Sequence, residues 1–178
     1  MELKLLLGAL HKIVTTLNEN KIEYQLSGSL AGKFYGLTRE SSDIDFALPI
    51  KYRPDIERLF GDSIVKAFYR CKDDFFDLDQ IKCVIDDIQV EFGFNENGFY
   101  HSHITGKAIA LGDFWRPFSI KFRNTTVQIQ SIEKLTEYKS HNRNPEFASN
   151  QIEDSLELEK IMASGSWKTF QIEAACEK

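Results

Sequence analysis

The segment from residue 22 to residue 48 constrains the fold more than any other part of the chain. Residues 22–27 alternate between apolar and polar types, which predicts a half-buried strand. The pair Gly28-Ser29 follows, and residues 30–36 are expected to form a short helix. Residues 43–48 predict a second strand. A strand, a glycine turn, a helix and a strand in close succession are typical of a small α/β or α+β domain.

Hydrophobic periodicity predicts helices at both ends of the chain and strands between them. An amphipathic helix is expected over residues 2–19. Ser131 is a candidate N-cap of another helix, and Asn144-Pro145 opens a longer one that ends near Gly165. Turns are expected at Asp86-Asp87 and Asn97-Gly98. The remaining predicted elements are helical segments at 54–60 and 167–175, and strands at 63–70, 81–85, 88–94, 107–111, 118–123 and 125–130.

The chain of 178 residues is expected to form a single domain around one core. Residues 1–130 form its α/β core, a mixed β-sheet flanked by helices, and residues 131–178 form C-terminal helices. No segment approaches the roughly 20 apolar residues that cross a bilayer, so no membrane function is expected. Three cysteines without a CxxC pair favour a reducing, cytoplasmic location. The net charge of −5 argues against broad adhesion to nucleic acid.

Two aspartates stand on one face of the predicted strand at 43–48. Asp43 and Asp45 are two residues apart, so their side chains point together, away from the apolar residues between and after them. In the strand at 88–94 the same alternation places Glu91 on the polar face. If the two strands are neighbours, Glu91 converges on the aspartates. The other candidates for a third carboxylate are Asp79, Asp86 and Asp87.

Carboxylates that converge in this way need a cation. Two like charges about 4 Å apart repel by about 4 kcal/mol at an effective dielectric constant near 20. Oxygen ligands that leave positions open for substrate phosphates suit Mg²⁺. Two such ions can clamp the attacking and leaving oxygens of a displacement at phosphorus. The backbone N–H groups after Gly28 and the Ser29 hydroxyl suit phosphate oxygens.

The combination of Gly28-Ser29 with Asp43-Ile44-Asp45-Phe46 resembles the signature of the DNA polymerase β type nucleotidyltransferase superfamily. The intervening residues 31–42, with Arg39 and Ser41 before the aspartates, most resemble its small bacterial branches. These include lincosamide and aminoglycoside nucleotidyltransferases and the nucleotidyltransferase toxins of abortive-infection modules. The resemblance covers residues 20–50 and, less closely, Glu91. It implies a mixed sheet flanked by helices.

The resemblance also implies roles for particular residues. Gly28 and Ser29 hold the phosphates of a nucleoside triphosphate, and Asp43 and Asp45 ligate two Mg²⁺ ions. Glu91, where the superfamily more often has aspartate, ligates the ion nearest the acceptor and is a candidate base for its hydroxyl. Arg39 and Lys33 lie close in sequence to the phosphate-binding turn. Each either neutralises phosphate charge or lies on the surface. Lys139 is either a second triphosphate contact or a solvated helix residue.

The sequence thus predicts an Mg²⁺-dependent enzyme that transfers a nucleoside monophosphate from a nucleoside triphosphate to a hydroxyl of a small molecule, an antibiotic being one example. One alternative is a toxin that modifies tRNA or protein, with a cognate antitoxin as partner. Another is a catalytically silent nucleotide-binding module. The base preference, the acceptor and a homo-oligomeric state stay open.

Overall fold

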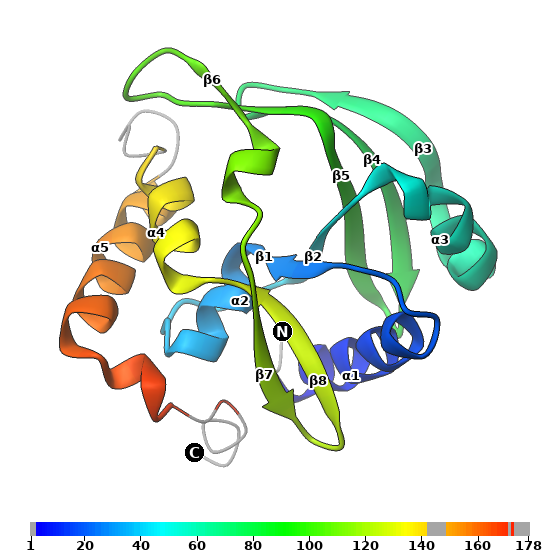
Figure 1. The fold of residues 1–178 in the computed structure, drawn as a ribbon, viewed down its shortest axis with the longest axis horizontal. Helices are drawn as coiled ribbons and strands as arrows, with labels where there is room; N and C mark the ends of the chain where they lie inside the picture. The colour runs from blue at the N-terminus through cyan, green and yellow to red at the C-terminus, as the bar shows by residue number, and fades with distance from the viewer. Residues whose placement is uncertain (1–2, 142–148, 171, 173–178) are drawn as a thin grey trace.

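The computed structural model describes residues 3–141, 149–170 and 172. Figure 1 shows the described elements along the chain. The helices are α1 (Leu3–Glu19), α2 (Gly28–Tyr35), α3 (Arg53–Phe60), α4 (Ile132–Ser140) and α5 (Ser149–Ser164), with short 3₁₀ turns between some of the elements. The strands are β1 (Gln25–Ser27), β2 (Asp43–Leu48), β3 (Ile64–Lys72), β4 (Phe76–Ile85), β5 (Ile88–His101), β6 (Ala108–Ala110), β7 (Pro117–Phe122) and β8 (Thr125–Gln130).

The strands form one mixed sheet, which confirms the predicted fold class. Its order is β3-β4-β5-β2-β1-β8-β7, and β6 pairs with β5 outside this path. The pairs β2–β5 and β1–β8 are parallel, whereas the other pairs are antiparallel. Strands β1, β2 and β5, which carry the predicted glycine turn and carboxylates, are therefore neighbours at the centre of the sheet.

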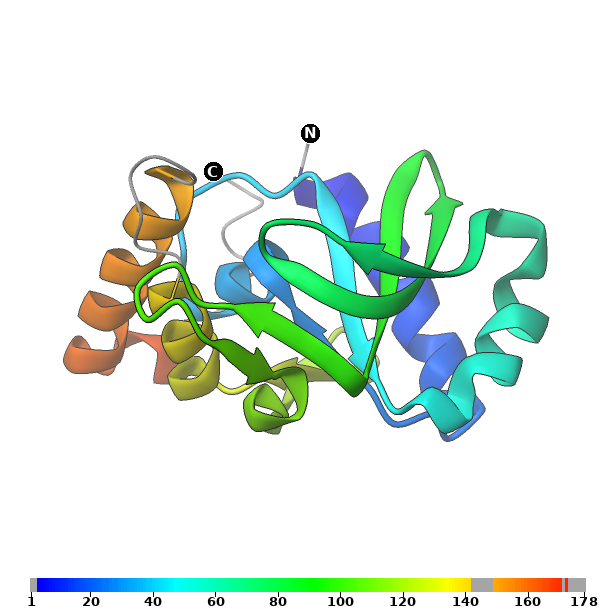
Figure 2. The ribbon, with the colours of Figure 1, turned by 90° about the horizontal axis from the view of Figure 1, so that it is seen from above.

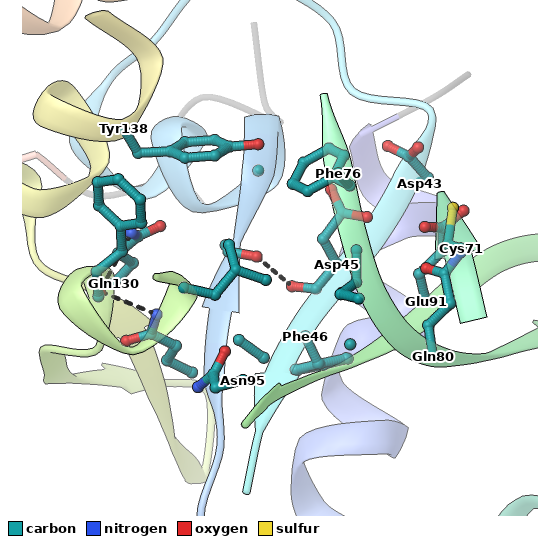
Figure 3. A pocket seen from close by; sticks show the side chains of 18 of the residues that line it. Asp43, Asp45, Phe46, Cys71, Phe76, Gln80, Glu91, Asn95, Gln130 and Tyr138 are labelled. Atoms are coloured by element: carbon teal, nitrogen blue, oxygen red, sulfur yellow. Dashed lines mark hydrogen bonds between the residues drawn. The ribbon is translucent and has the colours of Figure 1, made fainter. Parts of the chain in front are cut away.

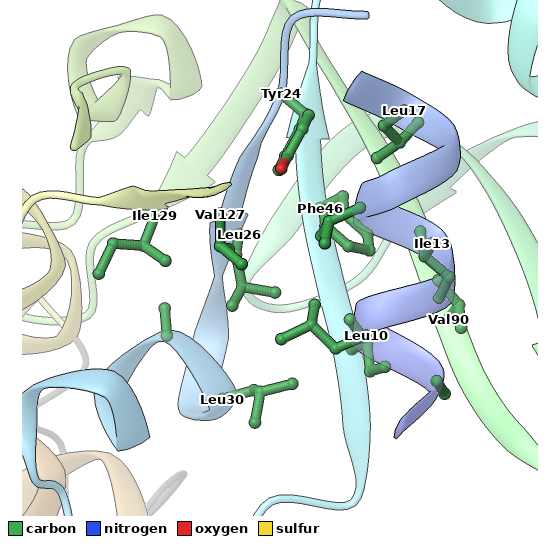
Figure 4. Packing of buried hydrophobic residues seen from close by; sticks show 14 of the residues in the cluster. Leu10, Ile13, Leu17, Tyr24, Leu26, Leu30, Phe46, Val90, Val127 and Ile129 are labelled. Atoms are coloured by element: carbon green, nitrogen blue, oxygen red, sulfur yellow. The ribbon is translucent and has the colours of Figure 1, made fainter. Parts of the chain in front are cut away.

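One face of the central strands packs against helices (Figure 2). In Figure 4, Leu10 and Ile13 of α1 and Leu30 of α2 point toward buried strand residues such as Phe46 and Val90. Because side chains alternate along a strand, burying this face leaves Asp45 of β2 and its neighbours on the other face. The core therefore fixes which side of the sheet carries the polar residues.

The C-terminal helices α4 and α5 contact each other, and both contact α2. Ser131 caps α4 as predicted, its hydroxyl accepting a hydrogen bond from the Lys134 N–H at 3.4 Å. Helix α5 ends at Ser164, because the next residue, Gly165, has a φ of +70°. Beyond it, a single 3₁₀ turn at Ser166–Lys168 replaces the start of the predicted helical segment. The predicted helix start at Asn144-Pro145 lies outside the described residues.

Several local predictions were wrong. The strand expected over residues 22–27 begins only at Gln25. Asn97-Gly98 is no turn but lies inside β5, where Asn97 has a φ of +59°. The pairing with β4 skips from Asp77↔Phe99 to Asp79↔Phe94, so the extra residues form a bulge that absorbs the left-handed conformation. Helix α2 also begins at Gly28, two residues before the predicted start. No helix among the described residues is long and apolar enough to cross a membrane.

Candidate active site

A cavity of about 390 Å³ opens on the polar face of the sheet. Figure 3 shows side chains from several elements that point into it. The strands contribute alternate residues, which is why the polar members of each pattern meet there: Gln25 and Ser27 of β1, Asp43 and Asp45 of β2, Gln80 and Lys82 of β4, and Glu91 and Asn95 of β5. The start of α2 and one side of α4 complete the wall. The cavity therefore brings all seven predicted site residues together, namely Gly28, Ser29, Arg39, Asp43, Asp45, Glu91 and Lys139.

The three carboxylates converge because β2 and β5 are parallel neighbours in a fixed register. Asp45 lies directly beside Glu91, and Asp43 lies beside Gln89. The other candidates for the third carboxylate lie elsewhere: Asp79 is 3.4 Å from Arg70, and Asp86 pairs with Lys12 beside the turn between β4 and β5. Strand parity thus selected the carboxylate that stands next to the aspartate pair.

Burial, together with the neighbouring carboxylates, raises the pKa values of both aspartates. Burial is the largest cause at Asp45, and the charges of Asp43 and Glu91 add to it, which raises the pKa of Asp45 to about 7. At Asp43, burial and Glu91 raise the pKa in the same direction, while Arg39 opposes them. Negative charge is therefore costly here without a cation close to the aspartates.

Gly28 is held against Asp45 with no room for a side chain. Its φ is +66°, and a Cβ atom there would lie 2.1 Å from Asp45 Oδ2. The next residue, Ser29, is buried, and its hydroxyl is 2.8 Å from that of Ser41. Ser41 in turn donates to the Asp43 carbonyl at 3.2 Å. The first turn of α2 and the start of β2 are thus locked together, with the helix N-terminus beside the carboxylates.

Two cations reach the cavity from outside the sheet, and both contact one aspartate of α5. The Lys139 ammonium is 2.7 Å from Asp154 Oδ2, and both side chains are only 1% exposed. Arg39 Nε lies 2.9 Å from the other oxygen, Asp154 Oδ1. Burial lowers the pKa of Lys139, an effect that Asp154 opposes. Lys139 is therefore no solvated helix residue. Lys33 turns away from the site and donates to the Thr38 carbonyl at 2.6 Å.

Sequence reasoning missed Lys82, which contacts the third carboxylate. Its ammonium lies 2.6 Å from Glu91 Oε1, and Gln89 Nε2 donates to the same oxygen at 2.7 Å. The signal was present: the predicted two-residue turn at Asp86-Asp87 places residue 82 opposite residue 91 in the hairpin. Asp154 was missed as well, and no local pattern marks it, because only the packing of α5 brings it to Lys139.

An aromatic wall lines the side of the cavity next to α4. It consists of Phe76, Phe114 and Tyr138, and the rings of Phe114 and Tyr138 meet edge to face at 5.5 Å. Figure 3 shows the Tyr138 hydroxyl pointing across the cavity toward Phe76. Burial raises the pKa of Tyr138 well above its ordinary value, so this hydroxyl stays protonated. The wall offers flat apolar surface beside the charged site.

The aspartate pair fits a magnesium ion. Among the described residues no group of three His, Cys, Asp or Glu side chains forms a complete cage for a metal. Mg²⁺ needs no such cage, since it commonly binds one or two carboxylates and completes its shell with water and substrate phosphates. Asp43 and Asp45, whose pKa values are raised by burial first and by the neighbouring carboxylates second, supply such a carboxylate pair.

The fold of the chain has counterparts among solved structures. A presumed nucleotidyltransferase of Thermotoga maritima is 20% identical, with a TM-score of 0.65 over 92% of this chain and 96% of that one. ANT(2'')-Ia in complex with adenylyl-2''-tobramycin is 14% identical, with a TM-score of 0.59 over 96% of each chain. The lincosamide adenylyltransferase LnuA, bound to lincomycin, is 13% identical, with a TM-score of 0.56 over 86% of this chain and 96% of that one.

No protein-family model matches the sequence, and no curated protein matches it. The similarity therefore lies in the architecture, and it extends over nearly the whole of each of these structures. The predicted resemblance is confirmed at the level of the fold, and the chain has the fold of the nucleotidyltransferases.

Proposed function

We propose that the protein is an Mg²⁺-dependent nucleotidyltransferase that moves a nucleoside monophosphate from a nucleoside triphosphate to a hydroxyl group of a small molecule. The observation that carries this proposal is the placement of Asp45 against Gly28 at the N-terminus of α2, with Asp43 two residues away in the same strand. The N–H groups at the start of α2 would then bind a triphosphate on one side, and a cation held by the two aspartates would bind it on the other.

Several residues around the aspartates would bind the phosphates. Gly28 and Ser29 offer backbone N–H groups and a hydroxyl at the start of α2. Arg39 and Lys139 add positive charge, and Asp154 holds both in place. Mg²⁺, when bound at Asp43 and Asp45, would neutralise charge on the reacting phosphate. The same residues would stabilise the negative charge that develops on the leaving pyrophosphate.

Glu91 is placed to accept the proton of the acceptor. Lys82 and Gln89 both contact Oε1, and among the described residues no hydrogen bond engages Oε2. We assign Oε2 the role of general base. The acceptor hydroxyl gives its proton to Oε2 as its oxygen bonds to the α-phosphorus. The bond between that phosphorus and the bridging oxygen breaks, and pyrophosphate leaves with the bonding electrons.

A small acceptor agrees best with the dimensions of the cavity. Its volume of about 390 Å³ is in the range of sites for small molecules. Two structures of the same fold, ANT(2'')-Ia and LnuA, contain an adenylylated antibiotic and an antibiotic, respectively. The cavity carries four acidic and three basic side chains, so a cationic acceptor suits it better than an anionic one. The cytoplasmic location remains a prediction from the cysteines.

The test is transfer of label from each of the four [α-³²P]nucleoside triphosphates with Mg²⁺, offered aminoglycosides, lincosamides, total tRNA and protein. We expect label on a small molecule and none with Asp45→Asn. The matched control is Asp87→Asn, which removes an exposed acid from a turn where Asn tolerates the φ of +62°. Label on tRNA or protein alone would favour the toxin alternative, and no transfer to any acceptor would contradict the proposal.

A further inference from the structure

Lys82 forms an ion pair with Glu91 beside the aspartates. It stands on β4, directly opposite Glu91 on β5, in a hairpin whose register is fixed by the turn at 86–87. Its ammonium lies 2.6 Å from Glu91 Oε1, inside the cavity wall. The third carboxylate therefore already has a cation that belongs to the protein itself.

The contact is built into the sheet rather than made by a mobile surface side chain. Lys82 is 29% exposed and Glu91 is 23% exposed, and Gln89 Nε2 holds the same oxygen of Glu91 at 2.7 Å. The positive charge of Lys82 also acts on Asp43 and Asp45. A divalent ion bound to Glu91 would be repelled by the Lys82 ammonium unless it displaced that ammonium from Glu91.

We propose that Lys82 replaces one metal ion, an inference that rests on the proposed function. The site binds a single divalent cation, at Asp43 and Asp45, and Lys82 is the permanent counterion of Glu91. This departs from the two ions that the resemblance implies. The aspartate pair holds the ion together with substrate phosphates, whereas Glu91 is kept free of metal.

The test counts ions rather than turnover. Mn²⁺ is the probe, and the protein is saturated with a non-hydrolysable α,β-methylene nucleoside triphosphate. Bound Mn²⁺ per chain is measured by electron paramagnetic resonance, after subtraction of the Mn²⁺ held by free nucleotide. We expect one ion in the wild type. In Lys82→Met, which keeps the length of the side chain but removes its charge, we expect a second ion, with an affinity at least tenfold higher than that of any second binding event in the wild type.

Two further variants separate charge from packing. Lys82→Arg keeps the positive charge and should bind one ion, and Lys82→Gln should behave like Lys82→Met if the methionine variant folds poorly. Lys72→Met is the matched control, because Lys72 is 74% exposed on neighbouring β3 and lies outside the cavity. It should bind one ion.

The outcomes distinguish this inference from the proposed function. Two tightly bound ions in the wild type, or one ion in both uncharged Lys82 variants, would overturn the role of Lys82 and leave the nucleotidyltransferase proposal standing. No bound ion in the wild type with nucleotide present would overturn both.

Discussion

Asp45 is the residue at which the fold makes ionisation of a side chain unfavourable. The hydrophobic alternation of β2 fixes its direction, the parallel register with β5 places Glu91 beside it, and Gly28 closes the space above it. Burial and two neighbouring carboxylates raise its pKa to about 7. The stability of the metal-free protein should therefore depend on the protonation of this one group.

The direction of that dependence follows from linkage. The folded-state pKa of Asp45 lies above its ordinary value of 3.8, so its contribution to stability is complete below about pH 4 and is lost as the pH rises through about 7. Asp45→Asn cannot ionise. At pH 8 without metal it should be more stable than the wild type by about 4 kcal/mol, which corresponds to a Tm increase of roughly 10 °C.

Thermal unfolding followed by circular dichroism at pH 4 and pH 8 measures this effect. At pH 4 the two proteins should differ little. Mg²⁺ at pH 8 should raise the Tm of the wild type and leave that of Asp45→Asn nearly unchanged, because a ligand of the folded state stabilises it. Equal Tm values at pH 8 in the absence of metal would contradict the account of Asp45.

Gly28 gives a second test at the residue scale. Gly28→Ala would place a Cβ atom 2.1 Å from Asp45 Oδ2 and must push the carboxylate away, so we expect transfer activity to fall at least about 100-fold. Gly106→Ala is the control, since Gly106 has a φ of +65° but nothing within 4 Å of its Cβ position. It carries the same backbone strain, about 1 kcal/mol, and should keep its activity. Equal activity losses would refute the collision argument.

At the scale of elements, helix α5 matters because Asp154 anchors the two cations of the phosphate site. Removing one partner of a buried ion pair leaves an uncompensated charge, so Asp154→Asn should lower the free energy of unfolding by about 3–5 kcal/mol. In the double variant Lys139→Met with Asp154→Leu, no buried charge from this pair remains. Urea unfolding should show that it recovers most of the loss.

A second readout separates positioning from stability. Under conditions in which Asp154→Asn is folded, we expect the KM for the nucleoside triphosphate to rise by at least tenfold, because Lys139 and Arg39 lose their common anchor. An unchanged KM would mean that Asp154 serves only to dock α5 onto the rest of the protein.

Strands β2 and β5 and helix α5 differ in how far they could be predicted from the sequence. Alternation fixed the faces of β2 and β5, and with them the convergence of Asp45 and Glu91, because the period of two follows from covalent geometry. The bulge at Asn97 escaped prediction because Asn-Gly is equally favourable in a turn, and only pairing with β4 decides between them. The anchor at Asp154 depends on how α5 packs, which no local pattern encodes.

At the scale of the whole molecule, the predicted division at residue 130 marks a change of secondary structure, and we propose that both parts form one domain. Ile132 and Leu135 of α4 and Leu158 of α5 belong to the same buried cluster as the residues of α1. We therefore expect a single cooperative urea transition, with fluorescence and circular dichroism curves that coincide. Two separate transitions would show that residues 131–178 fold independently.

Core packing also allows a prediction at this scale. Leu10 is fully buried where α1 meets the sheet, far along the chain from the site residues. Leu10→Ala should lower the free energy of unfolding by about 2–5 kcal/mol, as measured in urea. The exposed Leu5→Ala on the same helix should change it by less than about 0.5 kcal/mol. Similar losses in both variants would contradict the packing described for α1.

Transfer of a nucleoside monophosphate at the aspartate pair can be followed by comparing α-³²P and γ-³²P label from the preferred nucleoside triphosphate in the presence of Mg²⁺ and an acceptor. We expect the α label to move to the acceptor and the γ label to leave as pyrophosphate, and both events to stop in Asp43→Asn and Asp45→Asn. Transfer of the γ label to the acceptor, or unchanged transfer of the α label in both variants, would contradict the proposed transfer at the aspartate pair.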